Sequence, residues 1–342
     1  MKLLITGGAG YIGSHTSVAL MDRGHSIIIV DNFANSRRDV LDRIRQITGK
    51  NFKFYEIDVT DETALEKIFE AHQIDGVIHF AGFKAVGDSV QKPLDYYRNN
   101  VLSTIVLARC CLKYGVKRFV FSSSATVYGD NDVPFVETMQ LRPTTNPYGE
   151  SKAMCERILT DTARVNPGFA VAILRYFNPV GAHESGLIGE VPNGIPNNLM
   201  PYITQVAKGK LPKLYIFGND YPTVDGTGVR DYIHVMDLAE GHAAALEHLD
   251  EGVHIYNLGT GQGTSVLQLV KTFERVNGVE IPYVIVGRRP GDIAESYADV
   301  TNAARELGWT AKRSLEDMCR DAWRFEQNDH GFSDGEKEPR PD

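Results

Sequence analysis

The sequence predicts an α/β fold: a doubly wound parallel sheet of the Rossmann type, with a smaller α/β domain after it. In the first half of the chain, short apolar runs alternate with amphipathic stretches. This rhythm is typical of parallel sheets covered by helices on both faces. A glycine-rich turn, Gly7-Gly-Ala-Gly10-Tyr-Ile-Gly13, follows the first apolar run. We therefore expect ligands at the carboxyl ends of the strands.

The expected elements follow one another in regular order. The run KLLIT at residues 2–6 stops at the glycine-rich turn, and an amphipathic stretch at 14–23 comes next. The run SIIIVD at 26–31 ends on a carboxylate. The alternation continues with expected strands at 53–58, 76–81, 118–122 and 170–176, and expected helices at 62–72, 94–113 and 149–166.

The composition and pattern of the sequence change after Pro179. Glycine and proline become dense and the alternation fades. We interpret residues 1–179 as a dinucleotide-binding domain and 180–332 as a substrate domain, with a segment near 230–260 returning to the first domain. The last residues, 333–342, are polar and are expected to be disordered.

Composition limits the function. The chain has 342 residues, 42% of them hydrophobic, as in an ordinary globular protein. Its net charge of -8 argues against a nucleic-acid or anionic-lipid surface. The apolar start is too short for a signal peptide, and no run approaches the ~20 apolar residues of a membrane helix. The cysteines and histidines show no metal-ligand spacing, so we expect free thiols, a cytoplasmic protein and no metal.

The glycine-rich turn suits a dinucleotide. Gly7 allows the tight bend, Gly10 lets the backbone approach a pyrophosphate, and Gly13 lets helix pack on strand. The helix that follows would offer N–H groups and a partial positive charge to the diphosphate.

Asp31 ends the second expected strand, where its carboxylate can accept both ribose hydroxyls of a dinucleotide. It would repel a 2′-phosphate, which favours NAD over NADP. Arg37 and Arg38 are a mild contrary signal, but they fall late in the following loop.

Tyr148 and Lys152 lie four residues apart on an expected helix, so they project from the same face. An ammonium beside a phenol favours the ionised phenol and lowers a pKa that is normally about 10. Such a phenolate can take a proton from a sugar hydroxyl while a nicotinamide takes the hydride. Together with the glycine-rich turn, the pair indicates an oxidoreductase-type site.

Several longer motifs resemble those of the UDP-galactose 4-epimerases, members of the extended short-chain dehydrogenase/reductase superfamily. The similarity runs from about residue 2 to residue 332. The motifs are Thr6-Gly-Gly-Ala-Gly-Tyr-Ile-Gly-Ser-His15, Ser122-Ser-Ser-Ala-Thr-Val-Tyr-Gly129, Tyr148-x-x-x-Lys152, Arg175-Tyr-Phe-Asn-Pro-Val-Gly-Ala-His183, Gly194-Ile-Pro-Asn-Asn-Leu-Met-Pro201 and Asp225-Gly-Thr-Gly-Val-Arg-Asp-Tyr-Ile-His234.

The resemblance implies a permanently bound NAD and a UDP-hexose that is oxidised and then reduced at C4. It makes Tyr148 the acid/base, gives Lys152 the task of lowering the Tyr148 pKa and holding the nicotinamide ribose, and makes Ser124 a hydrogen-bond partner of the C4 oxygen. It also implies a homodimer that pairs the helices expected at 94–113 and 149–166, whose apolar residues are available for such an interface.

The resemblance carries further positions into the site. Those implied to contact the cofactor are Gly7, Gly10, Tyr11, Ile12, Gly13, Asp31, Asn32, Asn35, Ser36, Asp58, Val59, Phe80, Ala81, Gly82, Lys84, Asn99, Ser122, Tyr148, Lys152, Tyr176 and Phe177. Those implied to contact the UDP-sugar are Lys84, Ser124, Tyr148, Asn178, Asn198, Leu199, Phe217, Arg230, Arg289, Asp292 and Ser296. Two arginines can clamp a diphosphate through bidentate forks.

Ser296 bears on the range of substrates. Family members restricted to glucose and galactose carry a tyrosine at this position, and those that accept N-acetylated sugars carry a small residue. A phenol would fill the volume that an acetamido group needs. We therefore expect action on UDP-GlcNAc and UDP-GalNAc as well. An incidental loop serine remains the alternative, and a slip of one residue would place Tyr297 there instead.

Two other functions stay open. A nucleotide-sugar 4,6-dehydratase also makes a 4-keto sugar, but that family carries Asp-Glu where this chain has Ala125 and Thr126, neither of which does acid/base work. A non-catalytic NAD-sensing protein would not need Tyr148, Lys152 and Ser124 together.

Overall fold

The computed structural model describes residues 1–289 and 291–328. In these residues, seven parallel strands form the central sheet in the order β11-β6-β5-β4-β1-β2-β3. Their bounds are β1 Lys2–Thr6, β2 Ser26–Val30, β3 Lys53–Tyr55, β4 Gly76–His79, β5 Arg118–Ser124, β6 Ala170–Tyr176 and β11 Val253–Leu258. The strand order reverses between β1 and β4, the point where doubly wound sheets bind nucleotides. The predicted fold class is confirmed.

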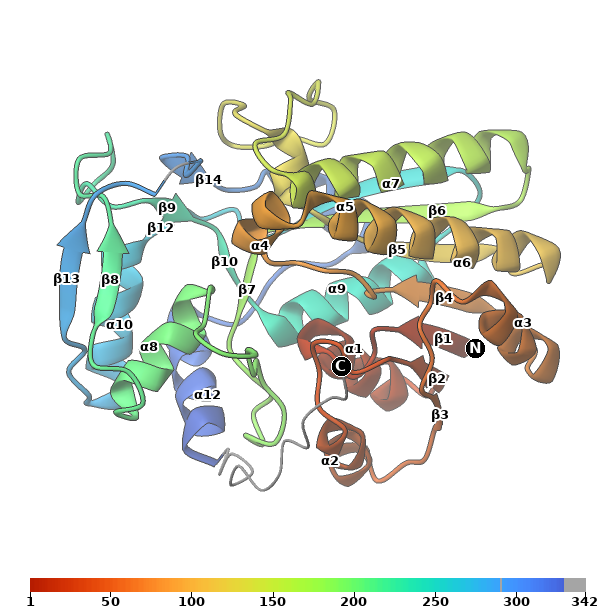
Figure 1. The fold of residues 1–342 in the computed structure, drawn as a ribbon, viewed down its shortest axis with the longest axis horizontal. Helices are drawn as coiled ribbons and strands as arrows, with labels where there is room; N and C mark the ends of the chain where they lie inside the picture. The colour runs from red at the N-terminus through yellow and green to blue at the C-terminus, as the bar shows by residue number, and fades with distance from the viewer. Residues whose placement is uncertain (290, 329–342) are drawn as a thin grey trace.

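Helices cover both faces of the sheet (Figure 1). One face carries α1 Tyr11–Asp22, α2 Asp39–Thr48, α9 Val235–Glu247 and α11 Thr301–Leu307. The other carries α3 Glu62–Ala71, α6 Leu102–Lys113 and α7 Pro147–Val165, and the short α4 Val86–Gln91 and α5 Pro93–Tyr96 precede α6.

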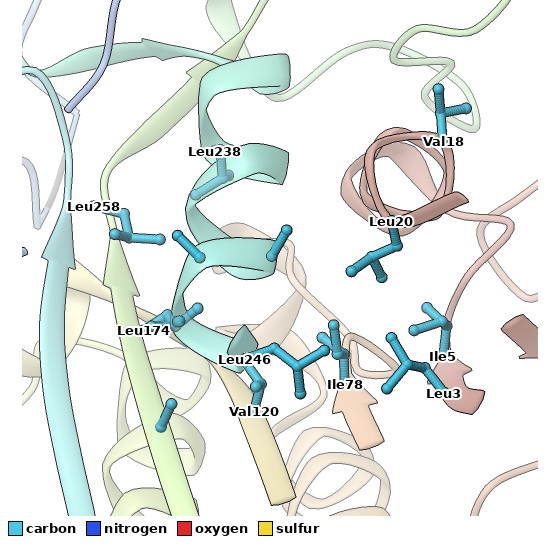
Figure 2. Close-up of a cluster of buried hydrophobic side chains, with 14 of the residues drawn as sticks. Leu3, Ile5, Val18, Leu20, Ile78, Val120, Leu174, Leu238, Leu246 and Leu258 are labelled. Atoms are coloured by element: carbon cyan, nitrogen blue, oxygen red, sulfur yellow. The ribbon is translucent and has the colours of Figure 1, made fainter. Parts of the chain in front are cut away.

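The strands read as continuous apolar runs because both of their faces are buried. Ile27 and Ile29 pack toward α1 and α9, whereas Ile28 and Val30 pack toward α3 and α6. Figure 2 shows the first of these two layers, in which leucines of α1 and α9 lie over the strands. This rigid sheet holds the strand ends at which the site forms.

A second lobe lies at the far left of Figure 1. Strand β8 (Leu214–Phe217) pairs with β13 (Tyr283–Val286), and α8 (Leu199–Ala207), α10 (Val266–Asn277) and α12 (Leu315–Asn328) share its core. Smaller pairings join the lobes: β7 (Asn178–Val180) with β10 (Tyr232–His234), and β9 (Val229–Arg230) between β12 (Thr264–Ser265) and β14 (Glu295–Ser296).

Several boundaries differ from the sequence-based expectation. Strands β2, β3 and β4 end at Val30, Tyr55 and His79, before residues 31, 58 and 81. The side chains of Asp31 and Asp58 accept hydrogen bonds from main-chain amides of the loops that follow β2 and β3. The helix expected at 94–113 is broken by a π-helical turn, Tyr97–Val101. Helix α7 begins earlier, at Pro147, because the Asn146 side chain accepts a hydrogen bond from the Gly149 amide. The tail at 333–342 lies outside the described residues.

Candidate active site

The glycine-rich turn is packed against its neighbours so closely that side chains do not fit. Gly7 has a φ of +70°, and a Cβ there would lie 2.7 Å from the Ala81 amide nitrogen. A Cβ on Gly13 would lie 2.3 Å from the Gly7 carbonyl oxygen. Gly10 opens α1 without a side chain to cap it. The turn therefore leaves bare backbone and a helix N-terminus for a phosphate.

Asp31 organises the loop beside this turn. Its buried carboxylate accepts hydrogen bonds from the Ala9 amide at 3.0 Å, the Phe33 amide at 2.9 Å and the Ser36 hydroxyl at 2.8 Å. The structure thus brings Asp31 to the glycine-rich turn, as expected.

The other expected cofactor positions gather at the same edge of the sheet. The Asn32 amide donates to Asp58 at 3.1 Å. The remaining residues of this group follow β2, β3 or β4 or open α1: Tyr11, Ile12, Asn35, Val59, Phe80, Ala81, Gly82 and Lys84.

Asn99 lies in the π-helical turn, next to the buried Asn100. The Asn100 side chain accepts from the Phe83 amide at 2.8 Å and donates to the Ser151 hydroxyl at 2.9 Å. It therefore joins the loop after β4 to helix α7. An inserted turn of this kind is frequent at functional sites.

Tyr148, Lys152 and Ser124 converge where α7 crosses the end of β5. The Lys152 ammonium is buried and donates to the Ser122 carbonyl oxygen at 2.7 Å. The Ser124 hydroxyl is a hydrogen-bond partner of Tyr148 and accepts from the Thr126 hydroxyl at 3.0 Å. The structure brings all three expected catalytic residues together.

The electrostatics differ from the sequence-based expectation. Burial raises the pKa of Tyr148, and the interaction with Ser124 only partly opposes this effect. The Lys152 ammonium donates to a main-chain carbonyl, and its burial lowers the pKa of Lys152 to about 8.

Tyr176 and Phe177 follow on the neighbouring strand end. The Tyr176 hydroxyl hydrogen-bonds the Ser122 hydroxyl, and Tyr148 lies close enough to raise the pKa of Tyr176 further after burial. Phe177 is buried in an apolar cluster with Ala125 and Ala298. These contacts place the end of β6 beside the catalytic group.

Glu190 lies among the expected site residues, although no sequence motif pointed to it. Its carboxylate accepts from the Lys84 ammonium and from the Asn198 side-chain amide, both at 2.7 Å. It therefore connects the loop after β4 to the start of α8, where Leu199 is the first residue.

The expected UDP positions of the second lobe come from several segments, namely β7, β8, β9 and the loop after β13. The Arg289 guanidinium pairs with Asp292 at 2.9 Å and lies 5.6 Å from the centre of the Phe217 ring. Arg230 donates to the Ala294 carbonyl at 3.4 Å, and Asn178 leads β7 beside β10.

Ser296 is 9% exposed and lies opposite Arg230 in the pairing of β14 with β9. Residues two apart in extended chain share a face, and Ala298 packs in the cluster of Ala125 and Phe177 beside the strand ends. The ring of the next residue, Tyr297, lies against Gly263.

Two kinds of feature are absent from residues 1–289 and 291–328. No helix there is long and apolar enough to cross a membrane. No group of three or more His, Cys, Asp or Glu side chains there is arranged to hold a metal ion.

Comparison with known proteins adds to this geometry. Residues 3–259 match the family model described as the NAD dependent epimerase/dehydratase family. The chain is 59% identical over 338 residues to the UDP-glucose 4-epimerase of Pasteurella multocida (strain Pm70), covering 98% of this chain and 100% of that protein.

Two solved structures are similar to it. The UDP-glucose 4-epimerase from Bifidobacterium longum in complex with NAD+ and UDP has a TM-score of 0.94 and 52% identity, covering 97% of this chain and 100% of that one. The UDP-Glc/GlcNAc 4-epimerase from Campylobacter jejuni has a TM-score of 0.83 and 38% identity, covering 95% and 99%.

Proposed function

The chain belongs to the NAD dependent epimerase/dehydratase family, and from that premise we propose that it interconverts UDP-glucose and UDP-galactose by inverting C4. The observation that carries the proposal is the convergence of Tyr148, Lys152 and Ser124 at the ends of β5 and β6. A phenol, an ammonium and a hydroxyl at this point are suited to moving a proton on a sugar hydroxyl.

The residues present fit NAD. The bare backbone at Gly7 and Gly13 and the N-terminus of α1 suit a pyrophosphate, and the Asp31 carboxylate suits ribose hydroxyls. When bound, NAD supplies the hydride acceptor and, in its oxidised ring, a positive charge. That charge acts in the direction opposite to burial, which raises the Tyr148 pKa.

The chain's own residues handle the proton. In our proposal Tyr148 removes the proton from the C4 hydroxyl of the sugar and later returns it to the 4-keto oxygen, so it ends the cycle unchanged. Ser124 hydrogen-bonds the C4 oxygen and shortens the path of the proton to the Tyr148 phenol, and Lys152 holds the nicotinamide ribose. The keto sugar turns over between the two transfers and presents its other face.

Positions 125 and 126 do not favour the dehydratase alternative. Ala125 is buried in an apolar cluster, and the Thr126 hydroxyl is committed to Ser124. Neither side chain can remove a proton from C5 or protonate a leaving hydroxyl.

The test is turnover of UDP-galactose by purified protein without added cofactor. Tyr148→Phe should keep the bound NAD and the affinity for UDP while losing about two or more orders of magnitude in kcat. Denatured wild-type protein should release NAD(H) rather than NADP(H), because of Asp31. Near-normal turnover by the phenylalanine variant would refute the role of Tyr148.

We also propose that the enzyme accepts N-acetylated UDP-hexoses. The support is the small, buried side chain of Ser296, which pairs with Arg230 where β14 lies beside β9. A hydroxymethyl group leaves room that a phenol would fill.

In the same proposal, Arg230 and Arg289 hold the diphosphate, Asp292 accepts ribose hydroxyls, and Phe217 contacts the uracil. Asn178, Asn198 and Leu199 lie near the join of the two lobes, where a UDP-sugar would have to cross.

The division into residues 1–179, with a return near 230–260, and 180–332 also stays a proposal. It is supported by the separate core of the second lobe. A cytoplasmic location is supported by the free and buried state of Cys110, Cys111, Cys155 and Cys319.

A homodimer is our proposal for the outer face of α6 and α7. Leu94 of α5, which precedes α6, is 79% exposed, and Met154 of α7 is 41% exposed. Val101 of the π-helical turn, Ile105 of α6 and Ile158 of α7 are partly exposed apolar residues of the same elements. Contiguous apolar surface on neighbouring helices is typical of an interface, and a second copy of the chain would complete it as a four-helix bundle.

A further inference from the structure

Helix α7 carries a third polar side chain in line with the catalytic pair. Glu156 follows Lys152 by one helical turn, as Lys152 follows Tyr148, so the three share a face. The Glu156 side chain is only 6% exposed. A carboxylate buried this deeply must have charged or hydrogen-bonding partners.

Glu156 has partners on both strands beneath the helix. Arg175 of β6 forms a bidentate pair with it, with Nη2 to Oε2 at 2.6 Å and Nε to Oε1 at 3.0 Å. The Ser123 hydroxyl of β5 donates to the same carboxylate. Charge-assisted forks of this kind fix position as well as supplying energy.

These partners alternate along the strands with residues of the catalytic group. Ser123 lies between Ser122, whose carbonyl holds Lys152, and Ser124, which bonds Tyr148. Arg175 precedes Tyr176, whose hydroxyl bonds Ser122. Glu156 therefore joins α7 to β5 and β6 at the level of the catalytic residues.

Resting on the proposed function, we propose that Glu156 is a positioning residue of the epimerase: it clamps the Tyr148–Lys152 helix to the ends of β5 and β6 and places a buried negative charge behind the Lys152 ammonium. Tyr148 and Lys152 touch the reactants, and Glu156 acts through them. It forms no bond with the substrate and transfers no proton.

Arg175 is the charged partner of the Glu156 carboxylate, and the other titratable groups that face Lys152 are uncharged. Cys155 of α7 and His79 of β4 also face Lys152, but burial raises the pKa of Cys155 and lowers that of His79 to about 3, so both are neutral at pH 7. The interaction with Glu156 raises the pKa of Lys152 against the larger effect of burial.

Two further titratable residues, Tyr128 and Glu137, contact Arg175. Burial raises the pKa of Tyr128 to about 12, so this ring, which stacks on the guanidinium, is uncharged. Burial also raises the pKa of Glu137, whose main-chain carbonyl accepts from Arg175 at 3.4 Å. Removing the Glu156 charge would leave Arg175 and Lys152 as two buried cations.

The experiment compares wild type, Glu156→Gln, Arg175→Met and the double variant, each purified with its NAD. The pKa of Lys152 is read directly from its 13Cε shift, assigned with Lys152→Met, and kcat for UDP-galactose is followed against pH. Glu156→Gln should lower the Lys152 pKa, because it removes a negative charge that raises that pKa. At pH 8 even one unit reduces the charged fraction, and with it kcat, by about fivefold.

The double variant distinguishes the effect of the Glu156 charge on Lys152 from an effect on folding. It restores the net charge around Lys152, so its Lys152 pKa should return toward the wild-type value, while Arg175→Met alone should raise that pKa. If Glu156→Gln does not fold, Arg175→Met against the double variant isolates the same carboxylate. Glu150→Gln, on the same helix but bonded to Thr144, is the matched control and should leave the pKa unchanged.

An unchanged Lys152 pKa in Glu156→Gln, or in the double variant relative to Arg175→Met, would overturn the inference even if the melting temperature falls. Failure of the proposed function is a separate result, namely wild-type protein that leaves UDP-galactose untouched.

Discussion

Gly13→Ala offers the sharpest test of the cofactor turn. The added Cβ would lie 2.3 Å from the Gly7 carbonyl oxygen and 2.8 Å from the Gly8 Cα. Both obstacles are main chain, so no side chain can rotate away, and the turn must open by roughly 0.7 Å to reach the shortest tolerable contact. That movement displaces the Gly7 carbonyl, which accepts from the Gly10 amide at 3.1 Å.

The magnitude follows from overpacking. Such a clash costs roughly 1–3 kcal/mol, and if the cost falls on the form that binds NAD, the affinity drops by about 5- to 150-fold. The assay is the NAD content of the purified protein after repeated dilution and concentration, with the melting temperature measured in parallel. Gly87→Ala is the control, because a Cβ there meets nothing within 4 Å. Full NAD occupancy and unchanged melting in Gly13→Ala would refute the reasoning.

Three further outcomes are expected. Ser296→Tyr should cut kcat/KM for UDP-GalNAc by about ten- to a hundred-fold while sparing UDP-galactose, and a wild type inert toward UDP-GalNAc would exclude the proposal. Because burial lowers the pKa of Lys152 to about 8 from its usual 10.5, kcat should fall as pH rises through about 8. The unfolded chain binds more protons between those two values, so the Lys152 contribution to the free energy of unfolding should rise with pH over the same window; Lys152→Met should remove that slope in thermal melts. Leu94→Glu should convert the proposed dimer to monomer by light scattering at micromolar concentration, and a monomeric wild type would contradict that proposal.

Local patterns predicted six strands of the sheet, β1 to β6, because each is an apolar run bounded by turn residues; the edge strand β11 was not predicted as a strand. The same patterns predicted that Asp31 lies beside the glycine-rich turn, because both follow strands that can be recognised from the local sequence. The π-helical turn at Tyr97–Val101 was missed because its cause is tertiary: Asn100 bonds the loop after β4 and helix α7.

Other site residues needed the folded chain. Glu190 meets Lys84 and Asn198 only when distant loops are brought together, and no spacing signals it. Glu156 did carry a signal, the repeat of four residues from Tyr148 and Lys152, but its partners on β5 and β6 could not be read from the helix alone. The burial that raises the pKa of Tyr148 also depends on packing and could not be read from the sequence.

The path of the chain limits how this molecule can be divided. After β6 it leaves the sheet for the second lobe, then comes back to lay α9 against α1 and to add β11 beside β6. A fragment ending at residue 179 would keep the nucleotide turn yet present β6 as an unpaired edge and lose the leucines of α9, of which Leu246 lies beside Val120 of β5 and Ile78 of β4 (Figure 2). Bare edges of this kind invite aggregation. Residues 1–179 are therefore not an independent folding unit, and their separate expression would require grafting residues 235–258 onto them.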